Sequence, residues 1–192
     1  MGQRKIPGML YILVSFIPWI AYWVLSGMGE RAGVAAALAI TLALLLPQLR
    51  RKEFNPMDLT SLLYFALANI FTFGLGLDVF VEKSGFLGYA ALSLMALLSL
   101  AIRQPYTLQV SRRDYPEVYW KDPTFLTVNN VITGVWAAIF LANAALFLAL
   151  RPPLTIILSN IAIAIGIAFS IIFPLKAPAY FASREFRKFD WK

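Results

Sequence analysis

An uncharged stretch of 27 residues, from Thr124 to Leu150, constrains the fold of this chain more than any other feature of its sequence. It follows Asp122-Pro123, a pair typical of a helix N-cap with proline at the first helical position, and it ends before Arg151. At 1.5 Å per residue, a helix of this length measures about 40 Å and exceeds the roughly 30 Å hydrocarbon core of a bilayer. The stretch therefore predicts a membrane-spanning helix.

The remaining composition is also typical of a membrane protein. Hydrophobic residues make up 60% of the 192 residues and charged residues only 14%, and the charges cluster between long apolar runs. We therefore expect an all-α membrane protein with one polytopic domain over residues 1–192. The predicted transmembrane helices lie at about 6–25, 32–49, 59–77, 85–102, 124–150 and 154–173, followed by a cytoplasmic interfacial tail at 174–192.

Two connections carry local signals. Asn55-Pro56-Met57-Asp58 is typical of a turn, and Asp58 is expected to cap the third helix. The 103–122 connection combines Tyr and Trp with charged residues, which predicts a loop or short helix at the level of the lipid headgroups.

The distribution of basic residues predicts the orientation. Fourteen of the 17 Lys and Arg residues belong to the N-terminus, the 50–58 and 103–122 connections and the tail, and three belong to the opposite turns. By the positive-inside bias, both termini are cytoplasmic and the six helices form three hairpins.

A short sequence similarity predicts an internal repeat. Residues 66–73 (ALANIFTF) parallel residues 140–147 (FLANAALF), with Asn69 and Asn143 in equivalent positions 74 residues apart. Arg103-Gln104-Pro105 and Lys176-Ala177-Pro178 recur at nearly the same offset. Hairpins two and three enter the membrane from the same side, so the repeat is expected to be parallel.

Several classes of function are disfavoured by what the sequence lacks. The chain has no Cys and no His, which removes disulfides, thiolate nucleophiles, most zinc sites and the commonest general base. The predicted spans hold no paired carboxylates, so we expect no enzymatic activity, no cofactor and no metal. The net charge of +7 follows from the positive-inside bias and not from nucleic-acid binding.

A polar and aromatic stripe on the 124–150 helix is the best candidate for a site. The stripe consists of Asn129, Thr133, Trp136, Phe140 and Asn143. At 100° per residue, these positions fall within about 80° of one another and should face inward. An amide in hydrocarbon is costly without a hydrogen bond. These side chains either bond neighbouring helices together, at about 0.6 and at most about 2 kcal/mol per bond, or line one polar site. With the asparagines of other spans, the candidates are Asn69, Asn129, Thr133, Trp136, Asn143 and Asn160.

A second set of candidates lies on the predicted cytoplasmic side. These aromatic and basic side chains are suited to contacts with anionic headgroups or with partner membrane proteins. They are Arg103, Arg112, Arg113, Trp120, Arg184 and Arg187.

The order of several features resembles a known family. The features are the aromatic first span with Phe16, Trp19 and Tyr22, the alanine-rich second span ending in basic residues, Arg103-Gln104-Pro105 after the fourth span, and Trp120 before a helix with Asn129 and Asn143. In this order the chain resembles the intracellular septation protein A family of small bacterial inner-membrane proteins. The resemblance implies a role in the cell envelope or in division that is exercised through partner membrane proteins.

Two functions therefore remain open at the level of sequence. One is a scaffold or interaction protein of the bacterial inner membrane, in contact with lipids and with other inner-membrane proteins. The alternative is a transporter or channel for a small neutral solute, with a polar site at Asn69 and Asn143 between the repeats. The predicted spans carry no acidic or basic residue, which disfavours the transport of ions.

Overall fold

The computed structural model describes residues 8–28, 31–51 and 55–189, without the side chains of residues 9, 49–51 and 178–189. Every regular element in this part of the chain is helical. The long helices are α1 (Gly8–Gly27), α2 (Ala32–Arg51), α3 (Pro56–Asn69), α5 (Ser84–Ala101), α7 (Pro123–Ala149) and α8 (Leu154–Phe189). The short ones are η1 (Ile70–Gly74), α4 (Val79–Glu82), α6 (Tyr106–Ser111) and η2 (Glu117–Tyr119).

Five helical segments among the described residues are long and apolar enough to cross a membrane. They are Leu10–Gly27, Pro56–Gly74, Ser84–Ala101, Pro123–Ala149 and Leu154–Ala177. The apolar part of α2, Ala32–Gln48, is shorter. The predicted all-helical class is confirmed for the described residues, and the five segments are compatible with a membrane protein. The sixth span stays a prediction.

The starts of two helices test the capping predictions. At α7, the Asp122 side chain accepts a hydrogen bond from the Phe125 amide at 2.9 Å, and Pro123 occupies the first turn, as predicted. At α3, the prediction that Asp58 is the cap is wrong. Asn55 caps the helix by accepting from the Met57 amide at 3.0 Å. Because α3 begins at Pro56, Asp58 lies inside the helix and is buried.

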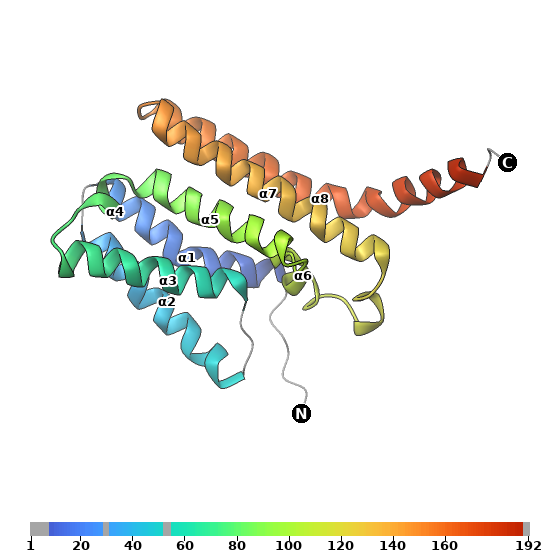
Figure 1. Ribbon diagram of the computed structural model, residues 1–192, viewed down its shortest axis with the longest axis horizontal. Coiled ribbons are helices and arrows are strands. Elements are labelled where there is room, and N and C mark those ends of the chain that lie inside the picture. Colours follow the sequence, from blue (N-terminus) through green and yellow to red (C-terminus); the bar gives the residue numbers. More distant parts are fainter. Residues whose placement is uncertain (1–7, 29–30, 52–54, 190–192) are drawn as a thin grey trace.

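Two helices end differently from the prediction. The third span changes at Ile70 into a π-helical turn, η1, instead of continuing as an α-helix to residue 77. The last helix does not stop at residue 173, because α8 runs on to Phe189. Figure 1 shows that α8 changes direction after the part that lies along α7. Pro174 lies in this region, and proline removes a backbone donor inside a helix. The interfacial position of 174–192 stays a prediction.

The helices form an open bundle. In Figure 1, α1, α2 and α3 lie on one side, α7 and α8 on the other, and α5 between them. Helix α5 packs most extensively against α7, and much less against α3. Helix α8 has its main contact with α7. These contacts do not confirm the predicted three-hairpin arrangement or the parallel repeat, and both stay predictions.

An aromatic cluster joins α1 to α3 in the core. The Trp19 ring is fully buried, and its centroid lies 4.8 Å from that of Phe65 and 5.0 Å from that of Tyr64. Its indole nitrogen donates to Ser61 Oγ at 2.8 Å. The Tyr22 and Tyr64 hydroxyls lie 2.7 Å apart. The indole and the phenols thus have hydrogen-bond partners in an apolar core.

Two glycines allow the close approach of α7 to its neighbours. A Cβ atom at Gly85 of α5 would lie 2.2 Å from the Phe147 ring, and one at Gly166 of α8 would lie 2.7 Å from Ile139 Cδ1. Small residues at such contacts are typical of helix packing in membranes, where backbone proximity provides van der Waals contact.

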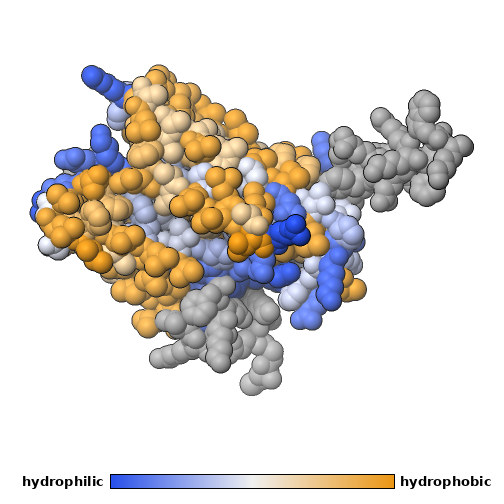
Figure 2. All heavy atoms as spheres, in the orientation of Figure 1, coloured by the Kyte–Doolittle hydropathy of each residue, from blue (hydrophilic) through white to orange (hydrophobic). Residues whose placement is uncertain are grey.

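The bundle has two distinct ends. We call the left-hand end in Figure 1, with Met28, Arg31 and residues 75–83 and 150–153, the turn end. The opposite end, with α6 and residues 112–122, is the loop end. In Figure 2, hydrophobic side chains dominate the flanks of the visible face, and hydrophilic ones gather toward the ends. The 103–122 connection contains the short helix α6, and its predicted position at the level of the lipid headgroups stays a prediction. Its α6 segment is buried, and Tyr115, Val118 and Tyr119 are exposed.

Candidate functional site

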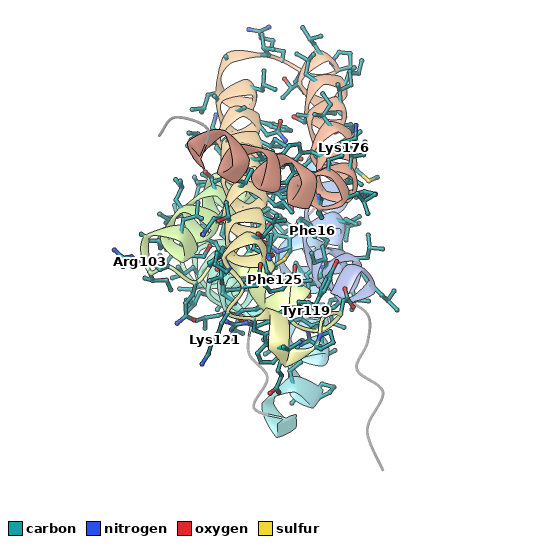
Figure 3. All side chains as sticks on the ribbon, turned by 90° about the vertical axis from the view of Figure 1, so that its right-hand side faces the viewer. Phe16, Arg103, Tyr119, Lys121, Phe125 and Lys176 are labelled. Atoms are coloured by element: carbon teal, nitrogen blue, oxygen red, sulfur yellow. The ribbon has the colours of Figure 1, made fainter. Side chains whose placement is uncertain are left out.

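A long groove separates α1 from α8 in the described part of the chain. Its volume is about 2030 Å³, and its floor is formed by α5 and α7. It extends from Met28, Lys83 and Pro152 at the turn end to Ser111, Tyr119 and Asp122 at the loop end. Figure 3, seen from the loop end, places Phe16 of α1 and Phe125 of α7 toward the middle of the molecule.

Each wall of the groove is one face of a helix. Residues spaced three or four apart share a helical face, and both lining sets follow that spacing. The α1 wall includes Leu13, Phe16, Ile20, Trp23 and Val24. The α8 wall includes Ile156, Ser159, Asn160, Ile163, Ile167 and Ser170.

Charged side chains lie only near the ends of the groove. At the turn end, Arg31 and Asp78 form an ion pair with an N–O distance of 2.5 Å, and this hydrogen bond raises the pKa of the Arg31 guanidinium. Glu82 and Lys83 are beside it in the lining, and Asp122 lies at the loop end. Between these ends, the described lining holds no acidic or basic side chain.

A hydrogen-bonded network fixes α6 on α7 at the loop end. Thr107 Oγ1 donates to the Asn129 carbonyl at 3.0 Å and lies 2.7 Å from Thr133 Oγ1. Ser111 Oγ donates to Asn129 Oδ1 at 2.8 Å, and Asn129 Nδ2 donates to the Phe125 carbonyl at 2.9 Å. The candidates Asn129 and Thr133 therefore hold the 103–122 connection in place on α7. Burial raises the pKa of the Tyr106 hydroxyl, which is next to Thr107 in the chain.

The predicted inward face of the 124–150 helix is confirmed. Asn129, Thr133, Phe140 and Asn143 are all buried. Trp136, on the same face, lines the groove and donates through Nε1 to Ser170 Oγ at 2.9 Å. This bond ties α7 to α8.

The two asparagines of the predicted repeat lie in different environments. Asn69 Nδ2 donates to the Val34 carbonyl at 2.9 Å and to the Phe65 carbonyl at 2.8 Å, so it joins α3 to α2. Asn143 is fully buried, and neither amide atom has a hydrogen-bond partner among the described residues. The groove lining includes neither residue.

We expect Asn143→Leu to raise the free energy of unfolding by about 1–3 kcal/mol, because an unpaired buried amide carries its full desolvation cost and leucine keeps the branched shape. The matched control Asn69→Leu should lower it by about 1 kcal/mol, because two hydrogen bonds are lost. Unfolding by dodecyl sulfate in mixed micelles measures both values. A loss of stability in Asn143→Leu would contradict this account.

The candidates on the loop-end side divide into two groups. Arg112 lies 5.2 Å from the centroid of the Trp120 ring, and Arg113 lies 3.8 Å from that of Tyr11. These contacts hold the connection together and attach it to α1. Arg103 is exposed at the end of α5 and points away from the bundle in Figure 3. The side chains of Arg184 and Arg187 lie outside the described part of the chain.

The sequence did not predict the buried polar cluster around Asp58. The Tyr11 hydroxyl donates to the Asp58 carboxylate, and Ser15 Oγ donates to it at 3.3 Å. The Tyr11 hydroxyl also lies 3.3 Å from Gln48 Oε1, so the cluster joins α1, α2 and α3. The available signal was the spacing of Tyr11 and Ser15, which places a hydroxyl pair on one face of α1.

The described residues contain no group of three or more acidic, His or Cys side chains that could hold a metal ion. The arrangement is thus a long apolar groove with polar groups on one wall and buried hydrogen bonds beneath it.

Comparisons with protein-family models, with curated proteins and with solved structures find no match for this chain.

Proposed function

We propose that this protein is a scaffold of the bacterial inner membrane, active in the cell envelope or in division, and that its α1–α8 groove binds a transmembrane helix of a partner protein. The proposed orientation puts the loop end in the cytoplasm, because it carries the basic connection that includes Arg103, Arg112, Arg113 and Lys121. The turn end, with fewer basic residues, faces outward.

The length of the groove is the observation that carries this proposal. The lining continues from Met28 and Arg31 to the 115–122 connection, so in the proposed orientation the groove passes through both leaflets. A transmembrane helix is about 30 Å long and spans the same distance between the two ends of the bundle. A single lipid chain reaches only half of that length.

The composition of the lining supports the same occupant. The α1 wall is almost entirely apolar, and the middle of the groove lacks the acidic and basic groups that the passage of charged solutes would require. The alternative of a neutral-solute path was based on Asn69 and Asn143, and the groove reaches neither. A scaffold needs only a complementary surface, which the two walls provide.

Photo-crosslinking in cells tests the proposal. A benzoylphenylalanine residue at Phe16 or Ile163, which line the groove, should form adducts that map to a transmembrane segment of another inner-membrane protein. The matched positions Leu97 and Ile161 are about half exposed and lie outside the lining. They should form adducts mainly with lipid. Only lipid adducts at all four positions would refute the proposal, and the identity of the protein adduct assigns the role to the envelope or to division.

A further inference from the structure

The first turn of α1 is capped by a residue from a distant part of the chain. Gly8 is the first residue of α1, and the amides of a first helical turn have no acceptor within their own helix. The Gly8 amide donates to Asp114 Oδ1 at 2.8 Å. A carboxylate of the 103–122 connection therefore does for α1 what a neighbouring cap residue does for most helices.

The contact between α1 and this connection is close. A Cβ atom at Gly8 would lie 2.7 Å from Asp114 Oδ2 and 2.7 Å from the Val110 carbonyl oxygen. One helical turn further along α1, the Arg113 guanidinium lies 3.8 Å from the centroid of the Tyr11 ring, a distance typical of a cation–π contact. The start of α1 is thus fixed on the end of α6 and the residues that follow it.

The same connection is fixed on α7. Thr107 and Ser111 of α6 donate to the backbone and the side chain of Asn129, respectively. Helix α7 in turn has the main contact with α8. The two walls of the groove, α1 and α8, are therefore joined at the loop end through the connection and α7. At the turn end, α1 has a separate attachment, because Trp23 Nε1 donates to the Ser84 carbonyl at 3.3 Å.

We infer that Asp114 is a positioning residue that sets the width of the groove at the loop end, because it holds the first turn of α1 through the Gly8 amide. This inference rests on the proposed helix-binding function of the groove. Neither Asp114 nor Gly8 lines the groove, so both act on a bound helix only through the α1 wall. Helix association in a membrane depends on van der Waals contact, and a gap of less than 1 Å already removes much of it.

Distances between spin labels on the two walls test the inference in the full-length protein. The chain has no native Cys, so pulsed electron paramagnetic resonance reports only on introduced pairs. The loop-end pair is Leu10→Cys with Leu175→Cys, and the turn-end pair is Met28→Cys with Ile157→Cys. All four side chains are at least half exposed. The protein is measured in phosphatidylethanolamine–phosphatidylglycerol vesicles without a partner.

The two residues of the contact are changed separately. Asp114→Ala should broaden the loop-end distance distribution, and Asp114→Asn, which keeps an acceptor for the Gly8 amide, should restore it. Gly8→Ala should lengthen the loop-end distance by about 1 Å, because carbon and oxygen atoms in contact need about 3.5 Å and the Val110 carbonyl allows 2.7 Å. The turn-end distance should stay the same in all three variants.

Each change has a matched control. Glu117→Ala removes an exposed carboxylate from the same connection. Gly27→Ala adds a methyl group at the other end of α1, where no atom lies within 4 Å of the new Cβ. Both should keep the loop-end distance. Circular dichroism melting verifies that each variant is folded.

Binding is measured by photo-crosslinking in cells from benzoylphenylalanine at Ile163, on the α8 wall. The yield of protein adduct should fall about 2- to 10-fold in Asp114→Ala, the range expected for one lost hydrogen bond, and should recover in Asp114→Asn. Unchanged loop-end distances in Asp114→Ala and Gly8→Ala would overturn the inference and leave helix docking intact. Changed distances with an undiminished protein adduct would overturn it as well. If no protein adduct forms even without a substitution, helix docking itself is refuted, and the distances still show whether Asp114 positions α1.

Discussion

Replacing Trp19 with alanine should lower the free energy of unfolding by about 3–5 kcal/mol, the usual cost of truncating a fully buried aromatic side chain. The ring is fully buried between Tyr64 and Phe65, so its removal leaves a cavity between α1 and α3. The Ser61 hydroxyl also loses the indole donor. Titration with dodecyl sulfate in mixed micelles, followed by far-ultraviolet circular dichroism, measures the change.

Two further variants separate the causes of this loss. Trp19→Phe keeps an aromatic ring and removes the bond to Ser61, so it should cost about 1–2 kcal/mol. Leu97→Ala truncates a side chain that is 48% exposed and should change stability by about 0.5 kcal/mol or less. Equal losses for Trp19→Ala and Leu97→Ala would mean that the aromatic cluster does not hold α1 on α3.

Replacing Tyr11 with phenylalanine should cost about 1.5–3 kcal/mol, because hydrogen bonds to carboxylates are stronger than those between neutral groups. The Tyr11 hydroxyl donates to Asp58 in a buried setting. The change removes one oxygen atom and keeps the ring, so packing is conserved. The same detergent titration measures the effect.

The matched control is Tyr64→Phe, which removes a bond between two neutral hydroxyls at 2.7 Å and should cost about 1 kcal/mol. In the double variant Tyr11→Phe/Asp58→Leu, the loss should be smaller than the sum of the two single losses, because no carboxylate remains to be satisfied. Strict additivity would mean that Tyr11 and Asp58 contribute independently.

Length, hydropathy and local motifs were enough to predict the all-helical class and the course of α7. Length and hydropathy identify a span because a bilayer of fixed thickness demands about 20 apolar residues. The Asp122-Pro123 start is equally local, since the cap bonds an amide three residues ahead. The inward face of α7 also followed from helical periodicity, because polar residues in hydrocarbon must turn toward the protein.

The contacts between distant side chains could be known only from the packing of the helices. Asp58 acts through Tyr11 and Ser15, which lie 47 and 43 residues earlier in the chain, and its place inside α3 depended on Asn55 taking the cap. Asn69 and Asn143 share a local sequence, yet one is hydrogen-bonded and the other has no partner among the described residues. The difference comes from the neighbouring helices and not from the motif.

The groove likewise could not be predicted from the sequence. In a bilayer, both lipid-facing and protein-facing surfaces are apolar, so hydropathy cannot tell which helices touch. Helix α8 has its main contact with α7, and the space between α8 and α1 follows from that single packing choice. Whether a polar side chain in such a bundle finds a hydrogen-bond partner depends on its surroundings, and residues distant in the chain set those surroundings.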